Sequence, residues 1–143
     1  MSLPTAERLA KAVAEALTAS GLATANHKRY PKYALADLAD VTVDVVPFYP
    51  VSVDAHDRGS TAREVQVLIL VQQRCEKTDD AKVDSLTLLL EDLAEWMAMT
   101  AIDGAGQPVE PVDVDRSDDL LDGGHFIGYA MGTYRVFREW VPS

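Results

Sequence analysis

The sequence predicts an α+β fold, in which a mostly antiparallel β-sheet is covered by two α-helices. Two segments carry apolar residues at helical spacing, and other segments alternate apolar and polar residues as half-buried strands do. The expected element order is α-β-β-α-β-β. Strands that follow one another directly in the chain favour antiparallel pairing. The 143 residues show no internal repeat and no low-complexity linker, so residues 1–143 are expected to form a single domain.

A first helix is expected from Pro4 to about Ser20. Pro4 suits the first turn of a helix, and Gly21 commonly ends one. One side carries an apolar stripe at every fourth position, formed by Leu9, Val13 and Leu17. The opposite side is expected to face solvent with Glu7, Arg8, Lys11 and Glu15.

Two strands are expected next. The first covers Val41 to Val45 and is expected to end at Pro47. The second, Arg63 to Gln73, has one apolar face, and its other face is apolar in the middle. This pattern predicts a helix on one side and a further cover, such as a second subunit, on the other. The segment between the strands, Phe48 to Ala62, is too long for a tight turn and is expected to form a β-arm or a flexible loop, where partners commonly bind.

A second helix is expected after the capping segment Thr78 to Asp80 and before Asp103 and Gly104. Its apolar arc is wider than that of the first helix, which is typical of a central core helix. The arc comprises Val83, Leu86, Leu90, Leu93 and Met97, with Leu89 and Trp96 beside it.

The last third of the chain is expected to be mainly β-structure. A short strand is predicted within Val109 to Val114, followed by a polar stretch from Asp115 to Gly124 and a long strand from Phe126 to Trp140. One face of this last strand carries Gly128, Ala130 and Gly132. Such small residues predict that a helix approaches the sheet closely there.

The net charge of −10 argues against a nucleic-acid-binding surface, because affinity for phosphate backbones comes mostly from Lys and Arg. It does not argue against a surface that DNA slides past. No apolar run reaches the roughly 20 residues of a membrane span. The N-terminus lacks the pattern of a signal peptide, so we expect synthesis and folding in the cytoplasm.

Catalytic, metal and cofactor motifs are missing from the sequence, and an enzyme is not expected. The single Cys75 predicts an inert thiol, and the three histidines, His27, His56 and His125, are expected in solvated loops. The acidic stretch from Asp113 departs from a calcium-binding loop, with Asp118 at the sixth position and Gly124 at the twelfth. A solvated acidic loop is the preferred interpretation there, with a weak calcium site as the alternative.

One basic and aromatic patch follows the first helix. It consists of His27, Lys28, Arg29, Tyr30, Lys32 and Tyr33. Three interpretations remain open: contact with nucleic acid, contact with an acidic surface of another protein or of a second copy, and a plain exposed loop.

The order of these segments resembles a group of small tailed-phage and prophage proteins. The resemblance rests on the segments Lys28–Tyr33, Leu35–Leu38 and Val41–Pro47. It continues through a strand, a helix and a strand: Val65–Gln73, Val83–Met97 and Tyr129–Arg138. The chain is similar to the tail terminators, or tail-completion proteins, of long-tailed phages. It departs from them at Gly104–Pro111 and in the Asp-rich stretch.

The resemblance implies a structural protein of the virion neck, assembled in the host cytoplasm. It implies a ring, usually of six copies, that stops growth of the tail tube and joins it to the head-side connector, with DNA passing through the bore and no membrane involved. Contacts with neighbouring subunits or the tube are expected at Lys28, Arg29, Tyr30, Lys32, Tyr33, Asp54, His56, Asp57 and Arg58. Residues expected to face the channel are Asp54, Asp57, Asp113, Asp115, Asp118 and Asp119. The alternatives are a head-completion or stopper protein of the same neck, and a small bacterial regulatory binding domain.

Overall fold

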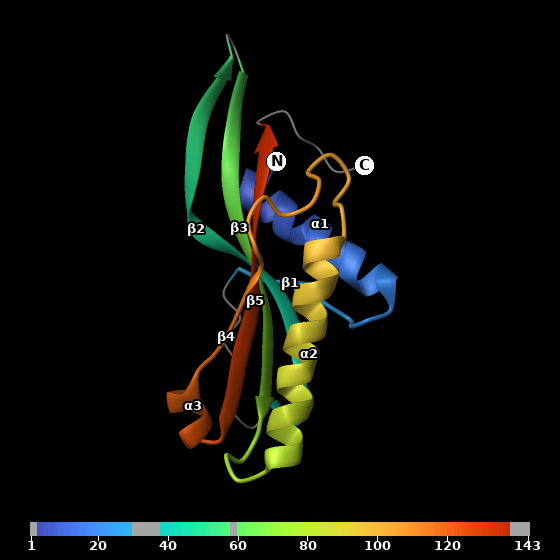
Figure 1. Ribbon diagram of the computed structural model, residues 1–143, viewed down its shortest axis with the longest axis vertical. Helices are drawn as coiled ribbons and strands as arrows, with labels where there is room; N and C mark the ends of the chain where they lie inside the picture. The colour runs from blue at the N-terminus through green and yellow to red at the C-terminus, as the bar shows by residue number, and fades with distance from the viewer. Residues whose placement is uncertain (1–2, 30–37, 58–59, 138–143) are drawn as a thin grey trace.

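The computed structural model describes residues 3–29, 38–57 and 60–137 (Figure 1). The helices are α1 (Thr5–Ser20), α2 (Asp80–Met99) and α3 (Asp118–Asp122). The strands are β1 (Asn26–His27), β2 (Thr42–Asp57), β3 (Ser60–Arg74), β4 (Asp113–Arg116) and β5 (His125–Phe137). The α+β class is therefore confirmed. The expected order lacked two short elements, β1 and α3.

The strands form a mixed five-stranded sheet in the order β1-β2-β3-β5-β4. β1 pairs with β2 in parallel, and the other three pairs are antiparallel. The prediction of a mostly antiparallel sheet is thus met in part, because it did not include the parallel β1–β2 pair. A strand of two residues has too little alternation to be recognised in a sequence. The connection from β1 to β2, residues 28–41, is long enough for the crossover that parallel pairing requires.

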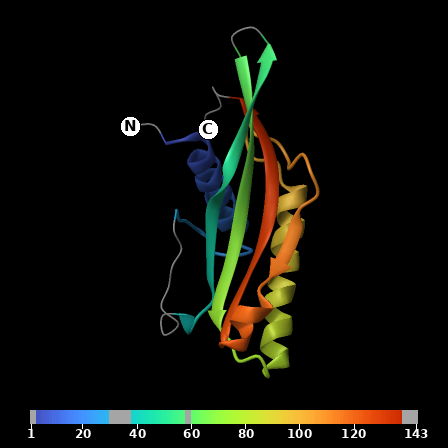
Figure 2. The ribbon, with the colours of Figure 1, turned by 90° about the vertical axis from the view of Figure 1, so that its left-hand side faces the viewer.

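Both long helices lie on one face of the sheet. α1 crosses β2 and β3, and α2 runs along β5 (Figure 2). The predicted apolar stripe of α1 is confirmed, because Leu9, Val13 and Leu17 are fully buried. The largest part of the core lies between these helices and the alternate residues of the strands that point toward them. We call the opposite side of the sheet, toward which Val46, Leu68, Leu70, Ile127, Tyr129 and Met131 point, the second face.

The close approach of α2 to β5 is also confirmed. A Cβ atom added at Gly128 would lie 2.4 Å from Leu90 Cδ1, and one added at Gly132 would lie 2.6 Å from Met97 Sδ. The side chain of Asp79 caps the helix by accepting a hydrogen bond from the Lys82 N–H, at 3.2 Å. The helix ends at Met99, a few residues before the expected stop, and a turn closed by the pairing of Ile102 with Gly106 follows.

The segment between the first two predicted strands is a β-arm. β2 and β3 both continue into it and project beyond the helices (Figure 1). The expected end of β2 at Pro47 is wrong. Val45 accepts the N–H of Lys28 and so directs its main-chain groups away from β3. Alternation directs the nitrogen of Pro47, two residues on, the same way, and its missing N–H costs no pairing to β3. The ladder is irregular between Phe48 and Ser52, around the cis peptide bond that precedes Pro50.

Candidate interaction surfaces

The second face carries half-buried apolar side chains in its middle. Leu68 and Leu70 of β3 lie beside Met131 and Tyr129 of β5. A hollow of about 400 Å³ opens here between Leu70, Tyr129 and the exposed Leu120 of α3. Burial, and then the neighbouring carboxylate of Asp115, raise the pKa of the Tyr129 hydroxyl. The predicted helix on one side of the sheet is confirmed, and a cover for the apolar middle of the other side stays a prediction.

Three of the predicted channel-facing residues point to this second face. The register places Asp113 and Asp115 opposite Met131 and Tyr129, and Asp54 lies next to Arg135, at 3.8 Å between Oδ2 and Nη1. Asp54 is separated from Asp113 and Asp115 by six residues along β5, or roughly 20 Å. They therefore share a face without forming one cluster.

The other expected acidic residues lie elsewhere. Asp118 and Asp119 belong to α3, where the side chain of Ser117 caps the helix by accepting the N–H of Leu120. Arg116 Nε lies 3.4 Å from Asp118 Oδ1. The backbone of Asp57 lies at the tip of β2, and its side chain is outside the described residues. The polar loop expected at Asp115–Gly124 is therefore a strand end and a helix.

The β-arm displays apolar side chains to solvent. Phe48, Tyr49 and Val53 are 44%, 56% and 55% exposed. Large apolar groups collected on a projecting hairpin are typical of a surface that binds another protein. Of the arm residues expected at an interface, Asp54 is described and exposed, the side chains of His56 and Asp57 are not described, and Arg58 lies outside the described residues.

The basic patch is only partly described. Lys28 and Arg29 are exposed at the end of β1, and Tyr30, Lys32 and Tyr33 lie outside the described residues. Arg29 Nε is 2.9 Å and His27 Nε2 is 3.1 Å from the same carboxylate oxygen of Glu7. The patch is thus tied to α1.

Glu7 was expected on the solvent-facing side of α1, and this is wrong, because the residue is 3% exposed. A buried carboxylate needs paired charges or hydrogen-bond donors, which His27 and Arg29 supply. The helical spacing in the sequence indicated that Glu7 lies on a buried side, although it is not part of the stripe of Leu9, Val13 and Leu17. Glu7 lies three residues before Ala10 and seven before Ala14, and both alanines are buried.

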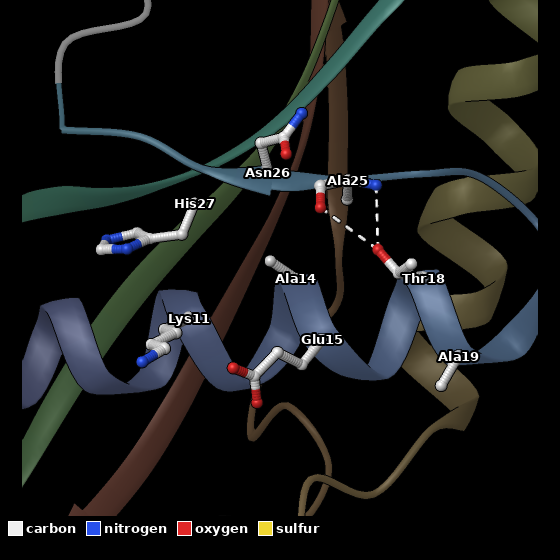
Figure 3. Close-up of a pocket in the computed structure, with 8 residues that line it drawn as sticks. All are labelled: Lys11, Ala14, Glu15, Thr18, Ala19, Ala25, Asn26 and His27. Atoms are coloured by element: carbon white, nitrogen blue, oxygen red, sulfur yellow. Dashed lines mark hydrogen bonds between the residues drawn. The ribbon is translucent and has the colours of Figure 1, made fainter.

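A groove of about 500 Å³ runs between α1 and the outer edge of β1 (Figure 3). Its walls include the small side chains of Ala14 and Ala25, and Lys11 and Glu15 stand along the helix. The hydroxyl group of Thr18 spans the groove at one end. It accepts the N–H of Ala25 at 3.0 Å and donates to the carbonyl oxygen of Ala25 at 3.2 Å.

Two of the histidines have specific partners, which corrects the expectation of solvated loops. His27 contacts Glu7, and His125 Nε2 lies 3.1 Å from the side-chain oxygen of Gln72. Cys75 is buried in the core, and this burial raises the pKa of its thiol. Among the described residues, no group of His, Cys, Asp and Glu side chains is arranged to hold a metal ion.

No helix in the described ranges is long and apolar enough to cross a membrane. No known family model matches the sequence, and no curated protein sequence is significantly similar to it.

Proposed function

We propose that the protein is a ring-forming structural subunit in the neck of a long-tailed phage, and specifically the tail terminator that caps the tail tube. The proposal starts from the resemblance of the segments Lys28–Tyr33 and Val41–Pro47 to this family. In this role the protein would bind further copies of itself, the tail-tube protein and the head-side connector.

The observation that carries the proposal is the β-arm. The arm exposes Phe48, Tyr49 and Val53, and no strand in the described part of the chain pairs with its outer edge. Both features are unfavourable on an isolated monomer, because such edges attract other strands. A subunit that lays this arm on a neighbour or on the tube would bury these groups. The arm thereby has a role in assembly.

The distribution of acidic residues supports a bore through which DNA passes. Asp54, Asp113 and Asp115 point to the second face. Six copies would carry six times −10, or −60 formal charges. Carboxylates that face a bore repel DNA phosphates, so the genome passes without being held.

The test is to mix the purified protein with unfinished tail tubes and image the tube ends by electron microscopy. We expect a ring at one end of each tube and an arrest of further growth. A variant in which Phe48, Tyr49 and Val53 are each replaced by Ser should fold and fail to cap, because these side chains are exposed and are the apolar groups that the arm would bury on its partner. Tubes that stay uncapped by the unaltered protein would refute the proposal. Binding to tail-less heads instead of tubes would assign the stopper role.

A further inference from the structure

The two edges of the sheet lie at the same level. One row of paired residues crosses all five strands, formed by Asn26, Asp44, Leu70, Tyr129 and Asp115. The next row is formed by His27, Val45, Ile69, Ala130 and Val114. β1 and β4 therefore stand at opposite ends of the same rows.

The directions of these edge strands are also compatible. β1 is parallel to β2, and three antiparallel steps lead from β2 to β4, so β4 runs opposite to β1. A second copy placed beside β1, and rotated by the twist that accumulates across the sheet, brings its β4 alongside β1 as an antiparallel partner. Val114 then lies opposite His27, and Asp113 lies opposite Lys28.

The outward main-chain groups match in this register. The Lys28 N–H donates to the Val45 carbonyl at 3.1 Å, so alternation along β1 directs the N–H and C=O of His27 away from β2. The Ser117 N–H donates to the Ile127 carbonyl at 3.0 Å, so the same alternation directs those of Val114 away from β5. His27 and Val114 thus face outward at opposite edges, as a pair that exchanges two hydrogen bonds requires.

The neighbouring outward groups are already occupied within the chain. The N–H and C=O of Ala25 are bonded to Thr18 Oγ1. The N–H of Arg116 is bonded to Asp115 Oδ1 at 2.7 Å. Among the described residues, the intramolecular bonds therefore leave the outward groups of His27 and Val114 available and limit the contact to a short segment.

The side chains are complementary in the same register. Lys28 follows Asn26 at the strand period and so points, like Asp113, to the second face, where the two carry opposite charges. Val114 points to the helix side and is 41% exposed. In the paired arrangement it enters the groove between β1 and α1, beside the methyl groups of Ala14 and Ala25 (Figure 3).

We propose that β4 of one copy pairs with β1 of the next, with Asp113 against Lys28 and Val114 in the groove beside α1. This inference rests on the proposed function and names the surfaces that join neighbouring subunits. The contact uses two different edges, so its repetition leads from copy to copy, and it gives a ring when the rotation between neighbouring copies closes after a whole number of subunits. Two hydrogen bonds and one apolar side chain make a weak single contact. The ring gains stability because every copy is held at both edges.

Disulfide cross-linking tests the register. In the proposed pairing the Cα atoms of Lys28 and Asp113 are roughly 4.5 Å apart, as in a pair without mutual hydrogen bonds. This distance permits a disulfide. The double variant Lys28→Cys/Asp113→Cys should form a ladder of covalent oligomers on oxidation. The matched control Lys28→Cys/Val114→Cys places the second thiol on the helix side and should give no ladder.

Charge reversal gives an independent test. Lys28→Asp makes both edges acidic and Asp113→Lys makes both basic, so each variant alone should associate at least tenfold more weakly in sedimentation experiments. An equimolar mixture restores opposite charges at every contact and should recover association. Glu91→Lys, on the exposed side of α2, should change nothing.

Three results would overturn the pairing: no ladder in free protein or on tubes, equal ladders in the control, or no recovery on mixing. The outcome is separable from the test of function. Capped tubes without a ladder would refute the pairing alone, and a ladder without capping would refute the tail role alone.

Discussion

The contact between α2 and β5 predicts that Gly128→Ala destabilises the protein. The added Cβ would lie 2.4 Å from Leu90 Cδ1 and 3.0 Å from the carbonyl oxygen of Asp115. Carbon atoms in favourable contact are about 3.5–4.0 Å apart, so the overlap with Leu90 exceeds an ångström. Leu90 is fully buried, but it borders a hollow of about 300 Å³ together with Thr87 and Val114, so a turn of its side chain relieves part of the overlap.

The expected magnitude is the difference between two effects. Overpacking of a core by one methyl group costs about 1–3 kcal/mol. Alanine is intrinsically better than glycine in a strand by about 0.5–1 kcal/mol. We expect a net loss of roughly 1–2 kcal/mol in the free energy of unfolding, which for a chain of this size lowers Tm by about 3–8 °C.

Thermal and urea unfolding followed by circular dichroism measure this loss. Gly123→Ala is the matched control, because its nearest contact is 3.4 Å from a backbone oxygen and its φ of −87° suits alanine. In a protein that already carries Leu90→Ala, the substitution Gly128→Ala should lower the free energy of unfolding by less than it does in the unaltered protein. The difference, which is the coupling energy between the two sites, should be at least about 0.5 kcal/mol. An unchanged Tm for Gly128→Ala, or strict additivity with Leu90→Ala, would refute the packing of α2 on this glycine.

Two further substitutions test buried polar groups. The hydroxyl group of Tyr134 is buried without a hydrogen-bond partner among the described residues, so Tyr134→Phe should leave the stability unchanged or raise it by up to about 2 kcal/mol in urea unfolding. A loss of stability would reveal a partner for this hydroxyl. Glu7→Gln removes the charge that holds His27 and Arg29 and should cost about 1–3 kcal/mol, whereas Glu15→Gln, exposed on the same helix, should stay within about 0.5 kcal/mol. Equal effects of the two glutamine variants would contradict the role of Glu7.

The interaction surfaces were less accessible to sequence reasoning than the core. Lys28, Arg29 and Asp54 were identified as candidates from their composition and setting, and they are exposed in the structure. Their partners were not identified, because Glu7 and Arg135 are distant from them in the chain. The groove beside β1 was also missed, since it depends on the spacing between α1 and a strand of two residues.

The elements with an extended hydrophobic period could be predicted from the sequence. Periodicity showed which sides of α1 and α2 are buried, including the side of α2 that carries Leu90. The small residues Gly128 and Gly132 showed where a helix meets the sheet. These features depend on neighbours three, four or two residues away along the chain, so local order suffices to reveal them.

Tertiary structure alone decided how distant segments meet. The parallel pairing of β1, the continuation of β2 past Pro47 and the burial of Glu7 all depend on residues far apart in the chain. A proline is tolerated in a strand when that strand lies at the edge of the sheet, and a carboxylate is tolerated in the interior when charged or hydrogen-bonding groups surround it. The sequence does not show which segments provide these surroundings. The alignment of His27 with Val114 across five strands likewise depends on tertiary structure, because it follows from the pairing registers of four successive strand pairs.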